Sequence, residues 1–340
     1  MILSTPIRRH AVAAVALAFA AAVALAGLAS PASAADPIEI RISTPAVPGD
    51  SHAEMLYIFK EWLERSAPGE FDVQVFLNAT LFAQGTEPVA MQRGNLEMAL
   101  ISAQDIAKQL PEYSIFTAGY LIRDPDHQQA VFGGPIGEEF YAKVKDAMDI
   151  QILDVAYLGT RQLNLRDVRD VRTPADLDGV NLRMPGSDTW QFLGRALGAN
   201  PTPLAFGEVY TSLQTGAIDG QDNPLPTDLA AGFYEVTNQI VLTGHLVDGV
   251  FFSMAASTWD SLSAEQHGLV RSAAAAAVRF NNENRLLNEA SLLDFFASKG
   301  MTITEPDVAA FRSHVQQQYL ESDFSNDWPD GLIDRINAVQ

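Results

Sequence analysis

Two periodicities of hydrophobic and polar positions alternate along the chain after its first 34 residues. Residues 38–42 (Ile-Glu-Ile-Arg-Ile) and 71–76 (Phe-Asp-Val-Gln-Val-Phe) alternate apolar and polar side chains, which predicts two half-buried strands. Between them, Ser51 and Glu54 form a capping box ahead of a helix that reaches about Arg65. The pattern therefore predicts a strand, a helix and a second strand.

The same order of elements continues through most of the chain. Further strands are predicted at 96–102, 150–157, 180–184, 217–221, 240–242, 250–256 and 301–304. Helical segments separate many of these strands, and the longest runs from Ala264 to about Ser298, with Gly300 to end it. Repeated strand–helix units predict mainly parallel sheets with helices on both faces. The predicted fold class is α/β, a two-lobed clamshell with the long helix bracing both lobes.

The length of 340 residues exceeds one ordinary hydrophobic core and suits two lobes of about 150 residues each. We expect residues 35–157 to form most of lobe 1 and residues 158–255 to form most of lobe 2. Residues 256–340 are expected to form C-terminal helices, including the long one, that pack on both lobes.

The first 34 residues have the pattern of an export signal. Arg8 and Arg9 form a basic start, residues 11–29 carry no polar side chain, and Ala32-Ser33-Ala34 is a small-residue cleavage site. We therefore expect residues 1–34 to be a cleaved signal peptide and the mature protein to be periplasmic. The alternative is an uncleaved membrane anchor, because the apolar run is nearly long enough to span a bilayer.

Charge and composition exclude several classes of function. The net charge of −20 argues against a nucleic-acid partner, and an anion would need positive charge supplied locally by its site. The chain has no cysteine, which excludes disulfides and thiolate chemistry, and its six histidines have no metal-site spacing. Nucleotide-binding and nucleophile motifs are absent from the sequence, so we expect no enzyme and no cofactor.

Three polar side chains are predicted at strand ends in the second half of the chain. Arg183 ends an apolar strand two residues before Pro185, and its planar guanidinium fits a carboxylate through two hydrogen bonds. Arg161 is expected at the end of the strand that begins near residue 150, and Asn223 follows the strand 217–221. Together they predict an anion receptor, although an arginine at such a place can also belong to a structural ion pair.

Five sequence blocks in this region resemble a known family. They are Gly159-Thr160-Arg161-Gln162, Leu182-Arg183-Met184-Pro185, Gly198-Ala199-Asn200-Pro201-Thr202-Pro203, Glu208-Val209-Tyr210 and Asp219-Gly220-Gln221-Asp222-Asn223-Pro224. Their residues, order and spacing are similar to those of the substrate-binding (P) subunits of TRAP transporters, the DctP family. The resemblance is specific within residues 157–235 and extends loosely over nearly all the chain after the signal.

The resemblance implies a periplasmic receptor that closes around an organic acid. Such a receptor delivers its ligand to a small (Q) and a large (M) integral membrane subunit driven by an ion gradient. By the same resemblance, Arg183 is the main carboxylate clamp and Arg161 assists it. Asn223 completes the grip, and Phe206 packs on the carbon skeleton of the ligand. Further candidate ligand-binding residues are Ser102, Gln104, Tyr210, Thr44 and Gln84.

The ligand class is narrowed by the residues of the first half. The Gly-Thr-Arg-Gln block looks like that of sialic-acid-binding members, but Ser102 and Asp105 offer no cation where those members place one. A hydroxylated monocarboxylate such as a uronate or an aldonate fits at least as well. A C4-dicarboxylate stays open, because Arg93, Lys108 or Arg123 could supply a second cation. A secreted hydrolase acting on acidic sugars through a carboxylate pair, or a receptor for a sensor kinase, also stays open.

Overall fold

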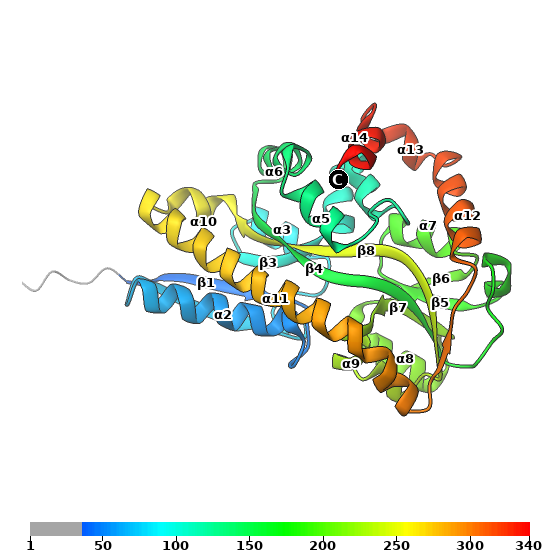
Figure 1. The fold of residues 1–340 in the computed structure, drawn as a ribbon. Coiled ribbons are helices and arrows are strands. Elements are labelled where there is room, and N and C mark those ends of the chain that lie inside the picture. The colour runs from blue at the N-terminus through cyan, green and yellow to red at the C-terminus, as the bar shows by residue number, and fades with distance from the viewer. Residues whose placement is uncertain (1–35) are drawn as a thin grey trace, which may run out of the picture. The chain divides into compact units, whose positions relative to one another are not determined.

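Nine strands form the centre of the structure, a computed structural model that describes residues 36–340 (Figure 1). The strands are β1 (Ile38–Ser43), β2 (Phe71–Phe76), β3 (Met98–Ser102), β4 (Ile150–Leu165), β5 (Asn181–Met184), β6 (Asn200–Pro203), β7 (Gly220–Pro224), β8 (Gln239–Ala255) and β9 (Thr302–Thr304). They form one sheet in the order β2-β1-β3-β8-β4-β7-β5-β6, and β9 pairs with β8. The predicted signal peptide lies outside the described residues, and Ile38–Gln340 form one compact unit.

Helices cover both faces of this sheet and the ends of its strands. They are α2 (Ser51–Ser66), α3 (Glu87–Gln92), α4 (Ala103–Ala107), α5 (Pro125–Phe132), α6 (Pro135–Met148), α7 (Asp188–Ala196), α8 (Val209–Thr215), α9 (Leu225–Ala230), α10 (Ala256–Ser261), α11 (Ala264–Ser298), α12 (Val308–Leu320), α13 (Phe324–Asp327) and α14 (Leu332–Ala338). Short 3₁₀ turns lie at η1 (Pro111–Thr117), η2 (Pro174–Leu177), η3 (Phe206–Glu208) and η4 (Phe233–Glu235). The predicted α/β class is therefore confirmed.

The sheet is mixed: five of its strand pairings are parallel and three are antiparallel. The antiparallel pairings all involve β4 or β8, two long strands that pair with each other. One group of parallel strands, β1 to β3, pairs with the second half of β8, and the other group, β5 to β7, pairs with the second half of β4. The two long strands thus join two groups of strands in one sheet.

The sequence pattern divided β8 wrongly into two strands, and it ended β4 too early. Polar residues and glycines interrupt the apolar run of β8 at Thr243, Gly244 and His245, yet Thr243 and His245 are fully buried. Their polar groups are satisfied inside the protein, so the strand continues where hydrophobic periodicity predicts a break. On β8, the neighbours Phe251 and Phe252 then point to opposite faces and enter two different hydrophobic cores.

The long helix α11 spans Ala264–Ser298, as predicted, and starts with a capping box in which Ser263 and Gln266 exchange hydrogen bonds. Gly300, with φ of 88°, follows its end in the left-handed conformation that favours glycine. The helix contacts α2 and β4 along its length and reaches α9 and β9 near its end. It therefore braces both groups of strands, as expected. Among the helices of residues 36–340, none is long and apolar enough to cross a membrane.

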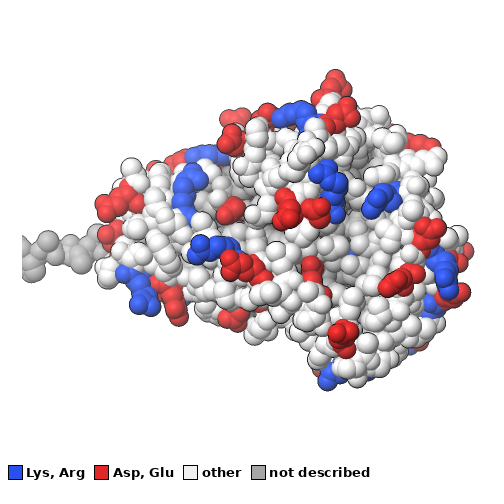
Figure 2. Space-filling view, in the orientation of Figure 1, with Lys and Arg blue, Asp and Glu red and all other residues white. Residues whose placement is uncertain are grey.

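Charged side chains of both signs are dispersed over the molecular face in view (Figure 2). With a net charge of −20, the surface field does not favour an approaching anion. Positive charge for binding an acid must therefore come from inside a site.

Candidate functional site: a polar cavity at the ends of the strands

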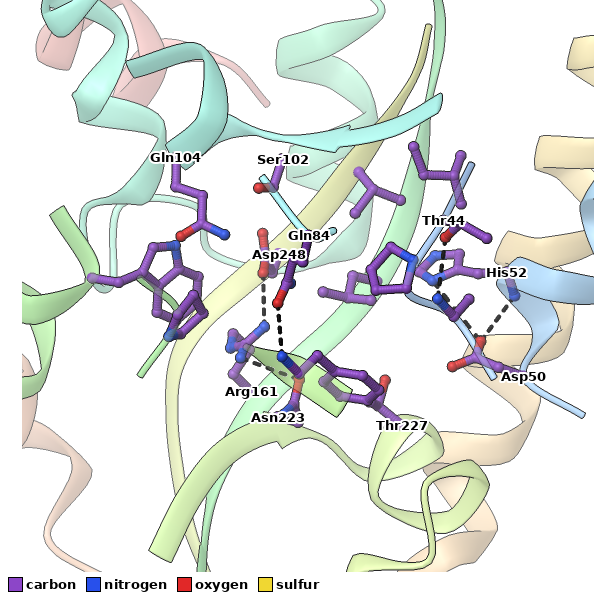
Figure 3. A pocket seen from close by; sticks show the side chains of 18 of the residues that line it. Thr44, Asp50, His52, Gln84, Ser102, Gln104, Arg161, Asn223, Thr227 and Asp248 are labelled. Atoms are coloured by element: carbon purple, nitrogen blue, oxygen red, sulfur yellow. Dashed lines mark hydrogen bonds and ion pairs between the residues drawn. The ribbon is translucent and has the colours of Figure 1, made fainter. Parts of the chain in front are cut away.

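A cavity with an empty volume of about 650 Å³ lies at the carboxyl ends of several parallel strands (Figure 3). Ligands in open α/β sheets bind at such ends, where loops diverge. Eight of the nine candidate residues from the sequence line it, and six of these are Ser102, Gln104, Arg161, Arg183, Phe206 and Asn223. Thr44 and Gln84, which follow β1 and precede α3, line it too. The structure therefore brings together residues from both groups of strands.

Tyr210 is the candidate that does not line the cavity. Its hydroxyl donates a hydrogen bond of 3.0 Å to Glu235, and its ring packs against the same small apolar cluster as Phe206. Of these two residues, only Phe206 lines the cavity.

Arg183 is a fully buried arginine at the end of β5, as predicted. Its Nε donates a hydrogen bond of 2.9 Å to the carbonyl oxygen of Leu204. Within the described chain, its second terminal nitrogen has no hydrogen-bond partner, and the guanidinium forms no ion pair. Burial lowers the pKa of Arg183 to about 9, with nearby Arg161 acting in the same direction and Asp222 opposing it. A buried cation without a counter-ion is costly, so pairing with an anion would stabilise this group.

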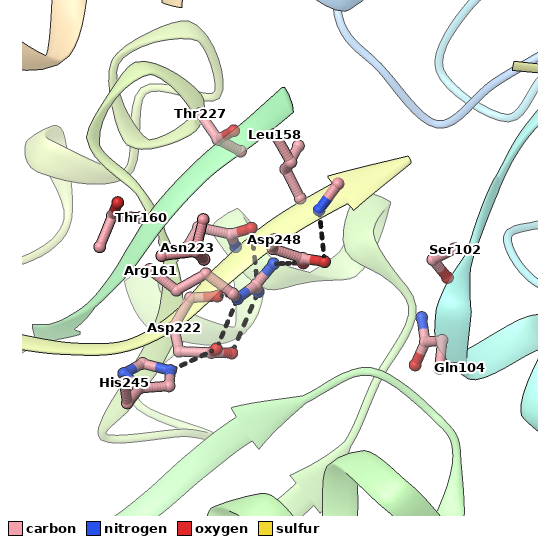
Figure 4. Close-up of polar contacts among 12 residues, drawn as sticks. Ser102, Gln104, Leu158, Thr160, Arg161, Asp222, Asn223, Thr227, His245 and Asp248 are labelled. Carbon is pink, nitrogen blue, oxygen red and sulfur yellow. Dashed lines mark hydrogen bonds and ion pairs between the residues drawn. The ribbon is translucent and has the colours of Figure 1, made fainter. Parts of the chain in front are cut away.

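Arg161 differs from the prediction, because it lies inside β4 and not at the end of a strand. Its Nε donates to Asp222 at 2.7 Å and one terminal nitrogen donates to Asp248 at 3.0 Å (Figure 4). The indole ring of Trp190 lies 4.3 Å from the guanidinium carbon. Burial alone would lower the pKa of Arg161, but the two carboxylates outweigh it and raise that pKa. The charge of Arg161 is therefore already compensated.

The buried ion pair extends to His245 of β8. Its Nε2 lies 3.1 Å from the Asp222 carboxylate, and its Nδ1 lies 2.8 Å from the hydroxyl of Thr243. Burial would raise the pKa of Asp222, yet Arg161 and His245 together hold it below its usual range. Asp222 thus stays ionised and fixes the side chains of Arg161 and His245.

Asn223 lies at the end of β7, beside the same network. Its side-chain oxygen accepts a hydrogen bond of 3.2 Å from Arg161, and its amide nitrogen donates to Gln221. An amide carries two N–H donors, so one remains for an oxygen in the cavity.

The first residue of the Gly-Thr-Arg-Gln block, Gly159, is a glycine for a steric reason. It sits at a register shift between β4 and β8 with φ of 130°, and a Cβ there would collide with Pro224 and with the carboxylate of Glu289. Only glycine lets β4 approach β7 this closely, and this approach brings Arg161 beside Asn223.

A second charged cluster at the cavity escaped the sequence analysis. Asp50 caps α2 by accepting a hydrogen bond of 2.9 Å from the backbone of His52, and it pairs with Arg285 of α11. Arg285 also donates to the carbonyl of Leu158 at 2.6 Å and to Thr227 at 3.2 Å. Burial and the charge of Arg285 lower the pKa of His52 to about 3, so its imidazole is neutral at pH 7. The sequence pattern placed the helix cap at Ser51 instead of Asp50, and Arg285 reads there as an ordinary charge of a long helix.

Two hydrogen bonds link opposite sides of the cavity. Gln84 accepts one of 2.9 Å from the backbone nitrogen of Phe206, and Ser187 donates one of 3.0 Å to Gln104. Both glutamines come from the first half of the chain, and both of their partners come from the second half.

The cations considered in the first half do not contribute to the cavity. Lys108 pairs with Asp105 at 3.0 Å, and Arg123 donates to carbonyls of Asn337 and Val339 near the C-terminus. Arg93 is not among the residues that line the cavity.

The fold and this cavity are those of a two-lobed solute-binding protein. The sequence model of the DctP family, described as bacterial extracellular solute-binding protein, family 7, matches residues 43–325, and the chain belongs to this family. Its members bind solutes and are not enzymes, which excludes the hydrolase alternative.

Known relatives agree with this assignment. A solute-binding protein of Roseobacter denitrificans is 32% identical over 301 residues, covering 88% of this chain and 92% of the relative. The sialic acid-binding periplasmic protein of Vibrio cholerae is 28% identical and covers 93% of this chain and 98% of its own length. A crystal structure of a TRAP periplasmic solute-binding protein from R. denitrificans holds 3-deoxy-D-manno-oct-2-ulosonic acid (KDO). It has 49% identity and a TM-score of 0.87, covering 90% of this chain and all of that one.

Proposed function

We propose that the protein is a periplasmic receptor that captures a sugar acid, a hydroxylated monocarboxylate, for a TRAP-type transporter. The observation that carries this proposal is the buried guanidinium of Arg183 at the wall of the cavity, which forms no ion pair within residues 36–340. The carboxylate of the acid forms two hydrogen bonds with this fork and neutralises its charge. Asn223 donates to the same carboxylate, and Phe206 packs against the carbon skeleton.

The remaining cavity wall suits the hydroxyl groups of such a ligand. Thr44, Ser102, Gln104 and Thr227 line it with hydroxyl and amide groups that donate and accept hydrogen bonds. Ligands of similar proteins support this class: KDO in the structure with 49% identity, L-galactonate in one with 29% and D-glucuronate in one with 27%. Each of these ligands has one carboxylate and several hydroxyls.

Transport follows from the class of receptor. Residues 1–34 direct export and are removed, and the mature protein delivers its ligand to a small (Q) and a large (M) membrane subunit. Residues 35–157 and 158–255 form most of the two lobes that close on the acid, with the C-terminal helices packed on both. The hydrogen bonds of Gln84 and Gln104 across the cavity hold the lobes together.

Thermal unfolding of the mature protein with single acids tests the proposal. A ligand that binds only the folded state stabilises it by about 2.7 kcal/mol at a hundred times its dissociation constant. We expect KDO, L-galactonate or D-glucuronate to raise the unfolding temperature, and succinate to leave it unchanged. The protein is first unfolded, dialysed and refolded, so that a co-purified ligand cannot mask the shift. A refolded protein that responds to none of the three sugar acids contradicts the proposal.

A further inference from the structure

Three arginines lie in or beside the cavity, and they differ in how their charges are compensated. Arg161 pairs with Asp222 and Asp248, and Arg285 pairs with Asp50. Arg183 forms no ion pair within residues 36–340. The site therefore offers one uncompensated positive charge, which matches a ligand with one carboxylate.

Asp248 is the carboxylate of this network that faces the cavity. It lines the cavity together with Ser102 and Gln104, and its side chain is 10% exposed (Figure 3). One oxygen accepts a hydrogen bond of 2.8 Å from the backbone of Gly249, and the other accepts one of 3.0 Å from Arg161. An ionised carboxylate has about four acceptor positions, so about two remain for a donor in the cavity.

We propose that Asp248 is a specificity-determining residue, which accepts a hydrogen bond from a hydroxyl of the bound acid and rejects a second carboxylate. This inference rests on the proposed function, with the first carboxylate on Arg183. A hydroxyl is neutral, so it donates a hydrogen bond to Asp248 without charge repulsion. A carboxylate in its place has no proton to donate, and it meets a fixed negative charge in a site of low dielectric.

The rest of the cavity offers a second carboxylate no better position. Asp50 lines it near His52, whose imidazole is neutral at pH 7. The cation there, Arg285, is already paired with Asp50 and donates to Leu158 and Thr227 as well. An acid with two carboxylates therefore leaves one of them unpaired.

Matched pairs of acids on one carbon skeleton test the inference in the unmodified protein. L-Galactonate and galactarate differ only in a terminal hydroxymethyl group, which is a carboxylate in galactarate. D-Glucuronate and glucarate differ only at the aldehyde carbon of D-glucuronate, which is a carboxylate in glucarate. Isothermal calorimetry measures each dissociation constant. We expect each monocarboxylate to bind roughly 10- to 100-fold more tightly than its dicarboxylate. This factor corresponds to the loss of one hydrogen bond to a charged group. Equal affinities within both pairs overturn the inference and leave the proposed function intact.

The Asp248→Asn variant assigns the selectivity to this side chain. It keeps the shape of the residue but removes its charge, and it frees part of the charge of Arg161 for a ligand. We expect it to bind L-galactonate, D-glucuronate and KDO more weakly and to lose most of the preference over the dicarboxylates. Asp178→Asn, an exposed change of the same chemistry, is the control and should keep the preference.

The outcomes are separable. An unchanged preference in a folded Asp248→Asn protein overturns the role of this residue. If that variant does not fold, the matched pairs in the unmodified protein still decide whether the cavity rejects a second carboxylate. Failure of the unmodified protein to bind KDO, L-galactonate and D-glucuronate contradicts the proposed function itself.

Discussion

The Nε atom of Arg183 donates a hydrogen bond of 2.9 Å to the carbonyl oxygen of Leu204. This contact orients the guanidinium without neutralising it, because a carbonyl carries no net charge. Arg161, in contrast, is held by the carboxylates of Asp222 and Asp248. The two arginines of the cavity therefore differ in how their charges are compensated: within residues 36–340, Arg183 forms no ion pair, whereas Arg161 pairs with two carboxylates.

Replacement of Arg183 by alanine should abolish most ligand binding. Loss of one partner of a buried, hydrogen-bonded charge pair costs roughly 2–5 kcal/mol, which is a large fall in affinity. The same change should not lower the stability of the ligand-free protein, because it removes a buried cation that forms no ion pair within residues 36–340. Calorimetry with KDO and thermal unfolding without ligand measure the two effects.

Arg183→Lys is the matched control for that experiment. It keeps a positive charge but loses the planar fork, so its affinity should fall between those of the unmodified protein and Arg183→Ala. Full affinity in Arg183→Ala would show that the carboxylate binds elsewhere.

Replacement of Arg161 by methionine should instead destabilise the protein with or without ligand. It leaves Asp222 and Asp248 buried without their cation, and breaking a buried pair in this way costs roughly 3–5 kcal/mol. Urea unfolding of the ligand-free protein measures the loss. Arg172→Met, which removes an exposed pair with Asp170, is the control and should change stability little. A fully stable Arg161→Met protein would contradict the structural role of Arg161.

Glu87 should make stability depend on pH. Burial raises the pKa of Glu87 to about 7, and Asp105 adds to this effect. Between pH 4.5 and 7 the unfolded chain has lost this proton while the folded protein keeps it, so stability falls as pH rises through this window. One oxygen of Glu87 accepts from the backbone of Gly85 at 2.6 Å, and the other has no partner among the described residues.

The variant Glu87→Gln removes this titration. Relative to the unmodified protein, it should gain roughly 3 kcal/mol of stability between pH 4 and pH 8, which is the pKa shift converted into free energy. Urea unfolding of both proteins at pH 4 and at pH 8 measures their free energies of unfolding, and the variant should be favoured more strongly over the unmodified protein at pH 8 than at pH 4. Glu61→Gln, on an exposed position of α2, is the control. Its free energy of unfolding should differ from that of the unmodified protein by the same amount at both pH values. A difference that does not grow with pH for Glu87→Gln would show that this carboxyl titrates normally.

The local sequence pattern and the five family blocks predict the limits of some elements and the positions of several cavity residues. The limits of α11 follow from composition and capping, and Arg183 at the end of β5 follows from an apolar strand stopped by Pro185. These features depend on residues near one another in the chain. The positions of Phe206 and Asn223 at the cavity follow from the blocks in the same way.

Tertiary structure alone decided which charges remain free. Asp222 and Asp248 lie 61 and 87 residues from Arg161, and Asp50 lies 235 residues from Arg285. No periodicity in the sequence relates residues so far apart, because their distances depend on how β4, β7, β8 and α11 pack. The same packing buries the polar residues of β8 and makes it one strand. The sequence by itself thus predicted most of the elements and the place of Arg183 at the end of β5, and only the fold decided that Arg161 is neutralised and that Arg183 forms no ion pair within residues 36–340.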